Sequence, residues 1–234
     1  SEFTLKAGQL LESVKRVSYA IPQQVGNATM STMCLQAKDG QLNFVGLDGH
    51  VLAWDKIDYD GEFELLIPKN TIDKLKTLEL TGEVRIRHSN AMAIFATENF
   101  EICTRLVQGE YYKYQNMFKE LPLHTVISRK ELLNAMVRAK MCTAEKCPVK
   151  FEIAGSQLSL SIKDQTTDYH ETVDLQEDIS EELTIGFDAR LVIETLKAFD
   201  CDNVGISLHS PKMPMIIEAE DSDFKTIVLP VTIK

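Results

Sequence analysis

"LKAGQLLESVKRVSYAI", residues 5–21, carries the pattern from which the fold can be worked out. Apolar side chains recur at the spacing of one helix face, namely at Leu10, Val14, Val17 and Ile21. Polar side chains fall on the opposite face, as in a helix that packs one side against a core. The stretch therefore predicts an amphipathic helix over residues 5–21.

Three further stretches predict helices, at 68–78, 128–141 and 187–199. Pro68 suits the first position of a helix because its missing N–H would have no partner there. Ser128 and Glu131 have the spacing of a capping box, and Asp188 is a good N-cap residue. Each of these helices has a sequence signal for its start.

Alternating apolar and polar residues between the helices predict hairpins of antiparallel strands. The expected turns are Asp39-Gly40, Ser89-Asn90, Gly155-Ser156 and Ser210-Pro211. The stretch "GLDGHVLAWD", residues 46–55, adds a strand, a tight Asp48-Gly49 turn and a second strand.

The order of helices and strands occurs twice, which indicates an internal duplication. Leu10-Leu11 is matched by Leu132-Leu133, 122 residues later, and Leu75-Lys76 by Leu196-Lys197, 121 residues later. We therefore expect two α+β domains of ordinary size. They would span residues 1–118 and 126–234, with residues 119–125 as the linker.

The charge is unevenly distributed. The chain has a net charge of −10, yet the four predicted helices hold twelve basic and five acidic residues, so they are +7 and the remainder is −17. One interpretation is an ordinary solvated helix face, because lysine is a good helix former. The other is a basic surface that contacts the phosphates of duplex DNA without reading its sequence.

Motif searches favour neither an enzyme nor a metalloprotein. The chain lacks the phosphate-loop, dinucleotide, nucleophile-elbow and zinc-protease motifs. A hydrolase using Asp48 and His50 remains an alternative, although no nucleophile accompanies them. The five cysteines are too scattered for a zinc site and are typical of reduced thiols in a cytoplasmic protein. No metal or cofactor is expected, and no apolar run is long enough to cross a membrane.

Several stretches together resemble the bacterial sliding clamp family, the beta subunit of DNA polymerase III. They are "LDGHVLAW" (47–54), "TRLVQGEYYKYQNMF" (104–118), "SRKELLNAMVRAKM" (128–141), the run 187–218 and the ending "IVLPVTIK" (227–234). The resemblance covers essentially the whole chain and matches the second and third domains of that family.

The resemblance implies a processivity factor without catalytic activity. In this family each domain packs two helices on antiparallel sheets, and six domains close into a ring whose helices face double-stranded DNA. The implied DNA-facing residues are Lys6, Lys15, Arg16, Gln24, Lys69, Lys74, Lys76, Lys130, Arg138, Arg190 and Lys197.

The family also binds DNA polymerase, the clamp loader and repair proteins through short peptides, and the Asp-Gly-His turn borders the pocket that receives them. The implied pocket residues are Met30, Leu47, Gly49, His50, Leu52, Pro214, Met215, Val228, Leu229, Pro230 and Val231. His50 would then be a rim residue. The alternative is an adaptor or decoy that binds such peptides without encircling DNA. Val51 and Thr232, which stand where the family has arginines, lean towards it.

Counting domains predicts the assembly. A ring of six domains would need three copies of a chain with two, so we expect a head-to-tail homotrimer. The alternative is a piece of a three-domain clamp, which would be a monomer. Met141 and Cys142, at the end of the third helix, would lie at the interface between copies.

Overall fold

The structure is a computed structural model that describes residues 1–234 except 24–25, 80, 143–147, 164–166 and 234. The chain forms two compact units, Ser1–Lys113 and Tyr114–Lys234. The domain limits expected from the sequence stay a prediction, although the last residues of the expected linker already belong to a strand that begins at Leu123.

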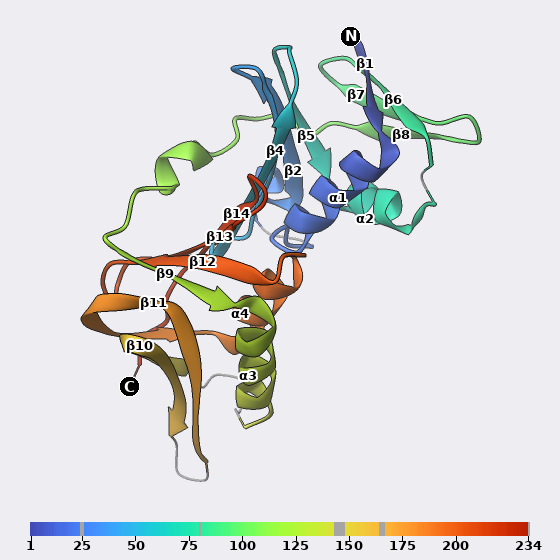
Figure 1. The fold of residues 1–234 in the computed structure, drawn as a ribbon. Helices are drawn as coiled ribbons and strands as arrows, with labels where there is room; N and C mark the ends of the chain where they lie inside the picture. The colour runs from blue at the N-terminus through green and yellow to red at the C-terminus, as the bar shows by residue number, and fades with distance from the viewer. Residues whose placement is uncertain (24–25, 80, 143–147, 164–166, 234) are drawn as a thin grey trace. The chain divides into compact units, whose positions relative to one another are not determined.

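The first unit contains two antiparallel sheets and two α-helices (Figure 1). One sheet has the order β1-β6-β7-β8, from Glu2–Lys6, Glu83–His88, Met92–Ala96 and Glu101–Arg105. The other has the order β4-β3-β2-β5, from Val51–Asp58, Gln41–Leu47, Thr32–Lys38 and Phe63–Pro68. The helices are α1 (Ala7–Ser18) and α2 (Lys69–Thr77), and a short 3₁₀ turn, η1, covers Ala28–Ser31.

The first helix begins two residues later than its sequence pattern suggested. Phe3 and Leu5 are buried while their neighbours are exposed, which is the period of a strand, and β1 pairs with β6 over this stretch. The second helix also starts late, because Pro68 is the last residue of β5 and only caps α2. Pairing with a neighbouring strand overrode helical propensity at both places.

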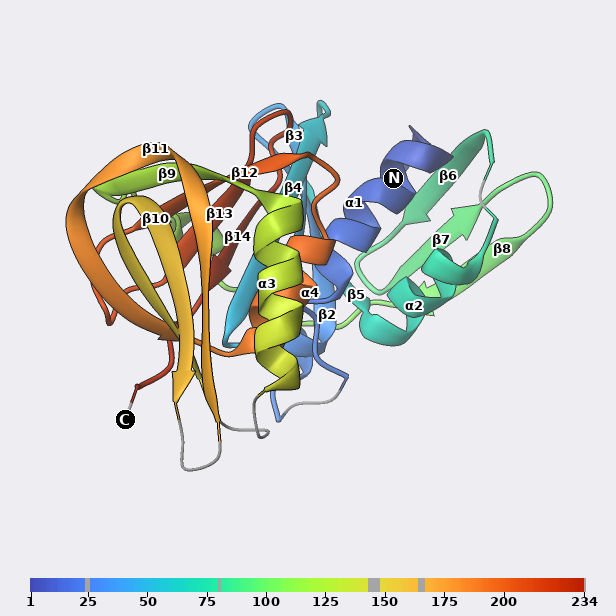
Figure 2. The same ribbon diagram turned by 60° about the horizontal axis from the view of Figure 1, so that its bottom comes forward.

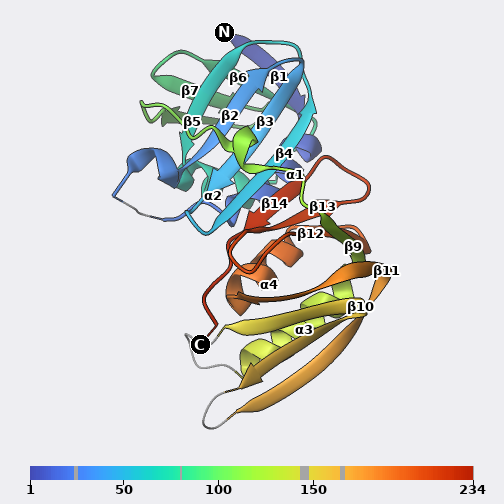
Figure 3. The same ribbon diagram turned by 90° about the vertical axis from the view of Figure 1, so that its left-hand side faces the viewer.

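Helix α1 lies against β3 and β4, and Figure 3 shows these strands in front of the two helices of the unit. Gly46 of β3 makes this close approach possible. A Cβ atom at this position would lie 2.5 Å from the carbonyl oxygen of Val17 and 2.9 Å from the Ile21 side chain. Leu10, Val14 and Val17 of α1 are fully buried, so the apolar row of the opening stretch forms the helix side of the core.

The second unit repeats this plan with one antiparallel sheet in the order β10-β11-β9-β12-β13-β14. Its strands are Val149–Lys163, Asp168–Phe187, Leu123–Ser128, Asn203–Leu208, Met215–Ala219 and Lys225–Val228, in that order. Its helices are α3 (Arg129–Met141) and α4 (Ala189–Lys197), and η2 covers Tyr114–Met117. Helices α3 and α4 pack side by side, α3 against the curved strands β10 and β11 and α4 against β14 (Figure 2).

The predicted N-caps Ser128 and Asp188 are confirmed, while the reciprocal bond of Glu131 in the expected capping box stays a prediction. The Ser128 hydroxyl accepts a hydrogen bond from the Glu131 backbone N–H at 3.4 Å, and Asp188 Oδ1 accepts one from the Arg190 N–H at 2.8 Å. The expected turn at Gly155-Ser156 is wrong. Gly155, at φ 53°, instead marks a register irregularity inside the long strand β10. The connection from β10 to β11 includes residues 164–166, outside the described part of the chain.

No helix among the described residues has both the length and the apolar character needed to cross a membrane.

Candidate nucleic-acid interface and partner pocket

The two helices of the first unit present a group of lysines to solvent. Lys15 of α1 and Lys74 and Lys76 of α2 are exposed, and none forms an ion pair with another described residue. The pKa of Lys76 lies below the usual lysine value. Packing removes water from its ammonium group, and the cations Lys69 and Lys15 lie nearby. The lysines of α1 and α2 therefore act on one another as one basic patch.

Lys69, at the start of α2, also links the two helices of the first unit. Its Nζ atom donates a hydrogen bond to the Ser18 carbonyl at the end of α1, at 2.8 Å, and lies 3.2 Å from the Asp73 carboxylate. A cation at the carboxyl end of a helix stabilises that end, because the last carbonyls have no partner within the helix. Lys69 thus joins the end of α1 to the beginning of α2.

Arg16, on the same helix as Lys15, is directed at the protein instead. Its guanidinium lies 2.6 Å from the Glu12 carboxylate and 3.5 Å from that of Asp55 on β4. The side chains of Arg16 and Asp55 are only 14% and 3% exposed, respectively. Burial raises the pKa of Asp55, and the Arg16 cation opposes that shift. This arginine neutralises a buried carboxylate, so little of its charge is directed at solvent.

The helices of the second unit present Lys130, Arg190 and Lys197, all exposed. Lys197 is 3.1 Å from Glu194 one turn earlier on α4, a contact that water weakens strongly. Arg129 at the start of α3 donates hydrogen bonds to the carbonyls of Cys201, at 2.6 Å, and Leu196, at 3.4 Å. It therefore covers the end of α4, as Lys69 covers the end of α1.

Arg138 occupies the position on α3 that Arg16 occupies on α1, 122 residues earlier. It forms a two-pronged contact with Glu171 of β11, in which Nε lies 2.9 Å from Oε2 and Nη2 contacts Oε1. Here the arginine and glutamate side chains are 54% and 24% exposed. The arginine–carboxylate pair is therefore shielded from solvent in the first unit and exposed to solvent in the second.

Ten of the eleven residues predicted to face DNA lie in the described part of the chain, and Gln24 lies outside it. Lys6 is exposed at the end of β1. The carboxylate partners Asp55 and Glu171 were missed, because they lie 39 and 33 residues from their arginines and no local pattern marks them. DNA contact by these residues stays a prediction.

The turn at Asp48-Gly49 is confirmed, and hydrogen bonds from its own backbone engage the Asp48 carboxylate. Oδ1 accepts hydrogen bonds from the backbone N–H groups of His50, at 2.9 Å, and Val51, at 2.8 Å. Gly49 has φ 87°, a backbone conformation that favours glycine. Because Asp48 bonds the backbone and not the imidazole, the acid–base pair that a hydrolase would need is not formed.

Pocket residues of the first unit gather around this turn. Gly49 and His50 are exposed, and a Cβ atom on Gly49 would lie 3.6 Å from the Met30 methyl group, so the methionine lies against the turn. Leu47 and Leu52 pair across β3 and β4 and are buried. Leu47 and Leu52 can pack beneath the turn, but they expose little apolar surface that a ligand could contact.

Pocket residues of the second unit lie at the end of the chain. Met215 and Val228 pair across β13 and β14 and are fully buried, while Pro214 and the segment 229–231 are half-buried. The Val231 N–H donates a hydrogen bond to the Gly186 carbonyl at 2.8 Å. A cavity of about 400 Å³ opens beside this contact, lined by Ile185, Gly186, Pro211, Lys212, Pro230, Val231, Thr232 and Ile233. Its lining is mostly apolar, which suits an apolar side chain of a ligand.

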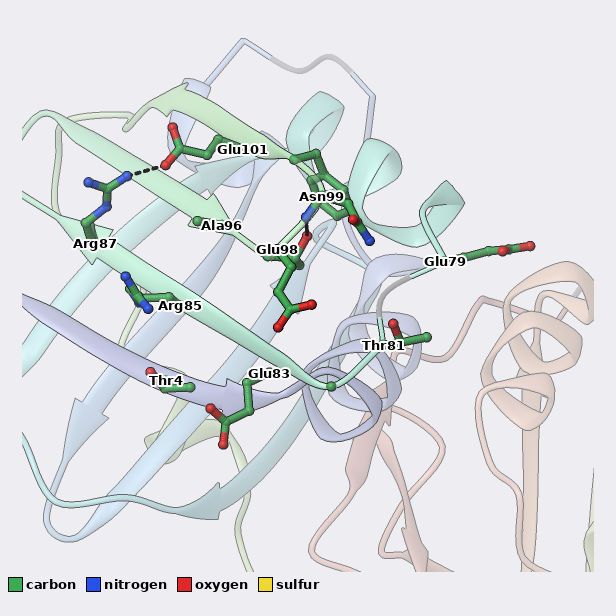
Figure 4. A pocket seen from close by; sticks show the side chains of 13 residues that line it. Thr4, Glu79, Thr81, Glu83, Arg85, Arg87, Ala96, Glu98, Asn99 and Glu101 are labelled. Atoms are coloured by element: carbon green, nitrogen blue, oxygen red, sulfur yellow. Dashed lines mark hydrogen bonds and ion pairs between the residues drawn. The ribbon is translucent and has the colours of Figure 1, made fainter.

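A larger cavity, of about 640 Å³, lies on the first unit, and its lining includes none of the predicted site residues (Figure 4). Its walls come from β1, β6, the end of β7, β8 and the connecting residues 79, 81–82 and 97–100, and six of the thirteen described lining residues are charged. Arg87 forms an ion pair with Glu101 across the strands, and Arg85 lies 3.7 Å from Glu2. None of the described residues that line the cavity is a histidine or a cysteine, so they offer neither an imidazole nor a thiol for catalysis.

Among the described residues, no three His, Cys, Asp or Glu side chains are grouped so that they could hold a metal ion. Cys34, Cys103, Cys142 and Cys201 are free thiols, and Cys147 lies outside the described residues.

Met141, one of the two predicted interface residues, is 81% exposed at the end of α3, and Cys142 follows it half-buried. Their role at an interface stays a prediction.

Two successive parts of the chain match two successive domains of one known protein family. Residues 4–113 match the central domain of the DNA polymerase III beta subunit, and residues 119–232 match its C-terminal domain. The chain belongs to the DNA polymerase III beta subunit family. The predicted family and the two repeated clamp domains of the α+β class are thereby confirmed.

Curated relatives of the chain are bacterial beta sliding clamps. It is 22% identical over 238 residues to the clamp of Buchnera aphidicola, 25% over 218 to that of Proteus mirabilis and 26% over 203 to that of Streptococcus pneumoniae. These matches cover 98, 88 and 82% of this chain, but the chain spans only 64, 59 and 53% of the relatives' lengths.

Solved structures confirm the fold. The DNA polymerase sliding clamp of Pseudomonas aeruginosa superimposes with a TM-score of 0.94 at 23% identity, over 99% of this chain and 67% of that one. The clamp of the same organism bound to griselimycin gives a TM-score of 0.93 at 23% identity, over 100% of this chain and 66% of that one.

The buried ion pair of the first unit gives a pH-dependent prediction. We expect Arg16→Met to destabilise the protein by about 3 kcal/mol at pH 7, because Asp55 then stays buried without its cation. Burial already raises the pKa of Asp55 above 3.8, so the folded state binds this proton more tightly than the unfolded chain. Ionisation of Asp55 therefore costs stability as the pH rises through its folded pKa, and losing Arg16 enlarges that cost. The destabilisation should shrink as the pH is lowered towards 3.8.

Urea denaturation of both proteins at neutral and at mildly acidic pH measures this difference. Lys15→Met, a change to a neighbouring exposed cation, is the control and should alter stability by less than about 0.5 kcal/mol at either pH. An equal loss from Arg16→Met at both pH values would contradict the role assigned to Asp55.

Proposed function

We propose that this chain is part of a DNA sliding clamp, a processivity factor in DNA replication that surrounds duplex DNA and carries out no chemistry itself. Membership of the beta subunit family supports this proposal. The observation that carries it to DNA is the group of exposed cations on the helices of both units, in a chain whose net charge is −10. An adaptor that never encircles DNA is not favoured, because it would have no use for these cations.

The proposed contact with DNA is weak and independent of sequence. Lysine is a flexible point charge, so it attracts phosphates without fixing the orientation of a base. A ring retains DNA by its topology and needs no tight contact. Weak contacts also let the ring move along the duplex, since each phosphate released on one side is replaced by the next.

The proposed partners are the polymerase and the clamp loader, bound through short peptides at the turn of the first unit and the cavity of the second. The half-buried segment 229–231, the half-buried Met30 and Pro214, and the exposed Gly49-His50 turn are the accessible parts of the predicted pocket. A related clamp has been solved with griselimycin bound, which supports ligand binding by this family. One leucine or phenylalanine side chain of a partner would gain about 1.5–3 kcal/mol on burial there.

The proposed assembly is a closed ring in which each copy contacts the next head to tail. If six domains complete the ring, three copies of this chain supply them. Met141 offers the most exposed large apolar side chain of the described residues and belongs to the proposed contact surface.

Charge reversal on the first unit tests the DNA contact. We expect the double change Lys15→Glu and Lys76→Glu to weaken binding of random-sequence duplex DNA. It should also reduce the slope of log affinity against log salt by about 0.9 for each phosphate that the protein no longer neutralises. Filter binding at several salt concentrations measures both quantities. The control, Lys38→Glu with Lys163→Glu, reverses two exposed lysines on strands. Equal effects of the two pairs would show a response to net charge only, and no effect of either would exclude DNA from the helix face.

A carboxylate in the apolar cavity tests the partner pocket. We expect Val231→Asp to weaken griselimycin binding by about tenfold or more, because the cavity wall then holds a charge that an apolar ligand would desolvate. Isothermal titration calorimetry measures the affinity, and Met92→Asp on the first unit is the matched control. The pocket assignment fails if the unchanged protein does not bind griselimycin or if Val231→Asp binds it as well as the unchanged protein.

Mass in solution tests the ring. Light scattering should give three times the chain mass of 26.4 kDa, and Met141→Glu should lower it towards that of one chain because it places a charge in the contact. Met117→Glu, at another exposed methionine, should leave the mass unchanged. A strict monomer at high concentration would exclude the trimer.

A further inference from the structure

Arg138 and Glu171 form the exposed one of two equivalent ion pairs, and their surroundings hold the glutamate in place. The Tyr169 hydroxyl contacts Glu171 Oε2 and lies 3.2 Å from the Ala135 carbonyl on α3. Glu171 is therefore held from two sides, by the Arg138 guanidinium and by the hydroxyl of Tyr169, a residue of β11 whose hydroxyl also lies against α3. The hydrogen bonds from Arg138 and Tyr169 also hold the pKa of this carboxyl below its usual value, so it is ionised at neutral pH.

The geometry of this contact is that of an arginine bound to a phosphate. A carboxylate and a phosphate both offer two oxygens to the planar guanidinium, which binds either with two parallel hydrogen bonds. Arg138 is more than half exposed and lies on α3, which also carries the exposed Lys130. Glu171 occupies the Nε–Nη2 edge of the guanidinium and opposes its charge, so this edge can bind a phosphate only if Glu171 releases it.

The equivalent pair in the first unit lacks this freedom. Arg16 and Asp55 are almost completely withdrawn from solvent, and Glu12 holds the guanidinium as well. The two repeats therefore use one arrangement in two ways. In the first unit the arginine is a permanent link between helix and sheet, while in the second it is held by a partner that water and ions can reach.

We propose that Glu171 is an intramolecular competitor for DNA phosphate at Arg138, which keeps this arginine from binding DNA while the lysines of the helices make the contacts. This proposal rests on the proposed function and assigns the residues of its DNA surface. Glu171 thereby limits how tightly the second unit holds the duplex. An arginine bound bidentately to phosphate would dissociate more slowly than a lysine, so masking it favours movement along DNA.

A double-mutant cycle tests the competitor role. We expect Glu171→Gln to tighten binding of a short random-sequence duplex and to steepen its salt dependence by about 0.9, the value for one added phosphate contact. Arg138→Gln alone should change binding little, because the arginine is already occupied. Glu171→Gln in the Arg138→Gln background should then have little effect. Tyr169→Phe, which loosens Glu171 without changing a charge, should give a smaller increase than Glu171→Gln.

The controls separate this proposal from simpler ones. Asp168→Asn removes an exposed acid from the same strand and should leave the salt slope unchanged. If Glu171→Gln tightens binding equally with and without Arg138, or if Asp168→Asn matches it, the effect is one of net charge and the competitor role is overturned. If Arg138→Gln alone lowers the salt slope as much as reversing a helix lysine, Arg138 contacts DNA directly and the proposal is also overturned. If no protein of the set binds duplex DNA, the proposed function itself fails, and the competitor with it.

Discussion

Burial of one apolar helix face on a sheet is the interaction on which the rest of the first unit depends. Helix α1 approaches β3 so closely that only glycine fits at Gly46, and three apolar side chains of the helix are fully withdrawn from water. Once that face is fixed, only the opposite face of the helix can carry charge. Lys15 lies on that outer face, and Lys69 ties the second helix, with its lysines Lys74 and Lys76, to the end of the first.

Duplication of this plan gave the two units room to diverge at equivalent positions. Arg16 and Arg138 stand 122 residues apart, and each meets a carboxylate from the sheet beneath its helix. The first carboxylate is an aspartate on β4, buried and close to the core. The second is a glutamate on the long strand β11, near the surface. One pair therefore contributes to cohesion between helix and sheet, and the other remains accessible to competing ions.

Much of the fold could be predicted from the sequence, because its signals are local. The helix periodicity, the caps at Ser128 and Asp188 and the turn at Asp48-Gly49 each depend on a few neighbouring residues. The errors arose where distant partners decide. Pairing of β1 with β6 shortened the first helix, and pairing of β10 with β11 kept Gly155 inside a strand. The candidate site divides in the same way. Its lysines could be located from the sequence, but the carboxylates that engage two of its arginines could not.

The Asp48 turn has a consequence for the entropy of recognition. Because its carboxylate already accepts two backbone hydrogen bonds, the loop between β3 and β4 is held in one conformation before any ligand arrives. A ligand that meets the His50 ring there would not have to order this loop, and the free energy that ordering consumes in a flexible loop would remain available to strengthen the complex. Rigidity in this short loop would thus favour binding by short, intrinsically disordered segments, which must lose their own freedom on docking and gain most from a surface that loses none.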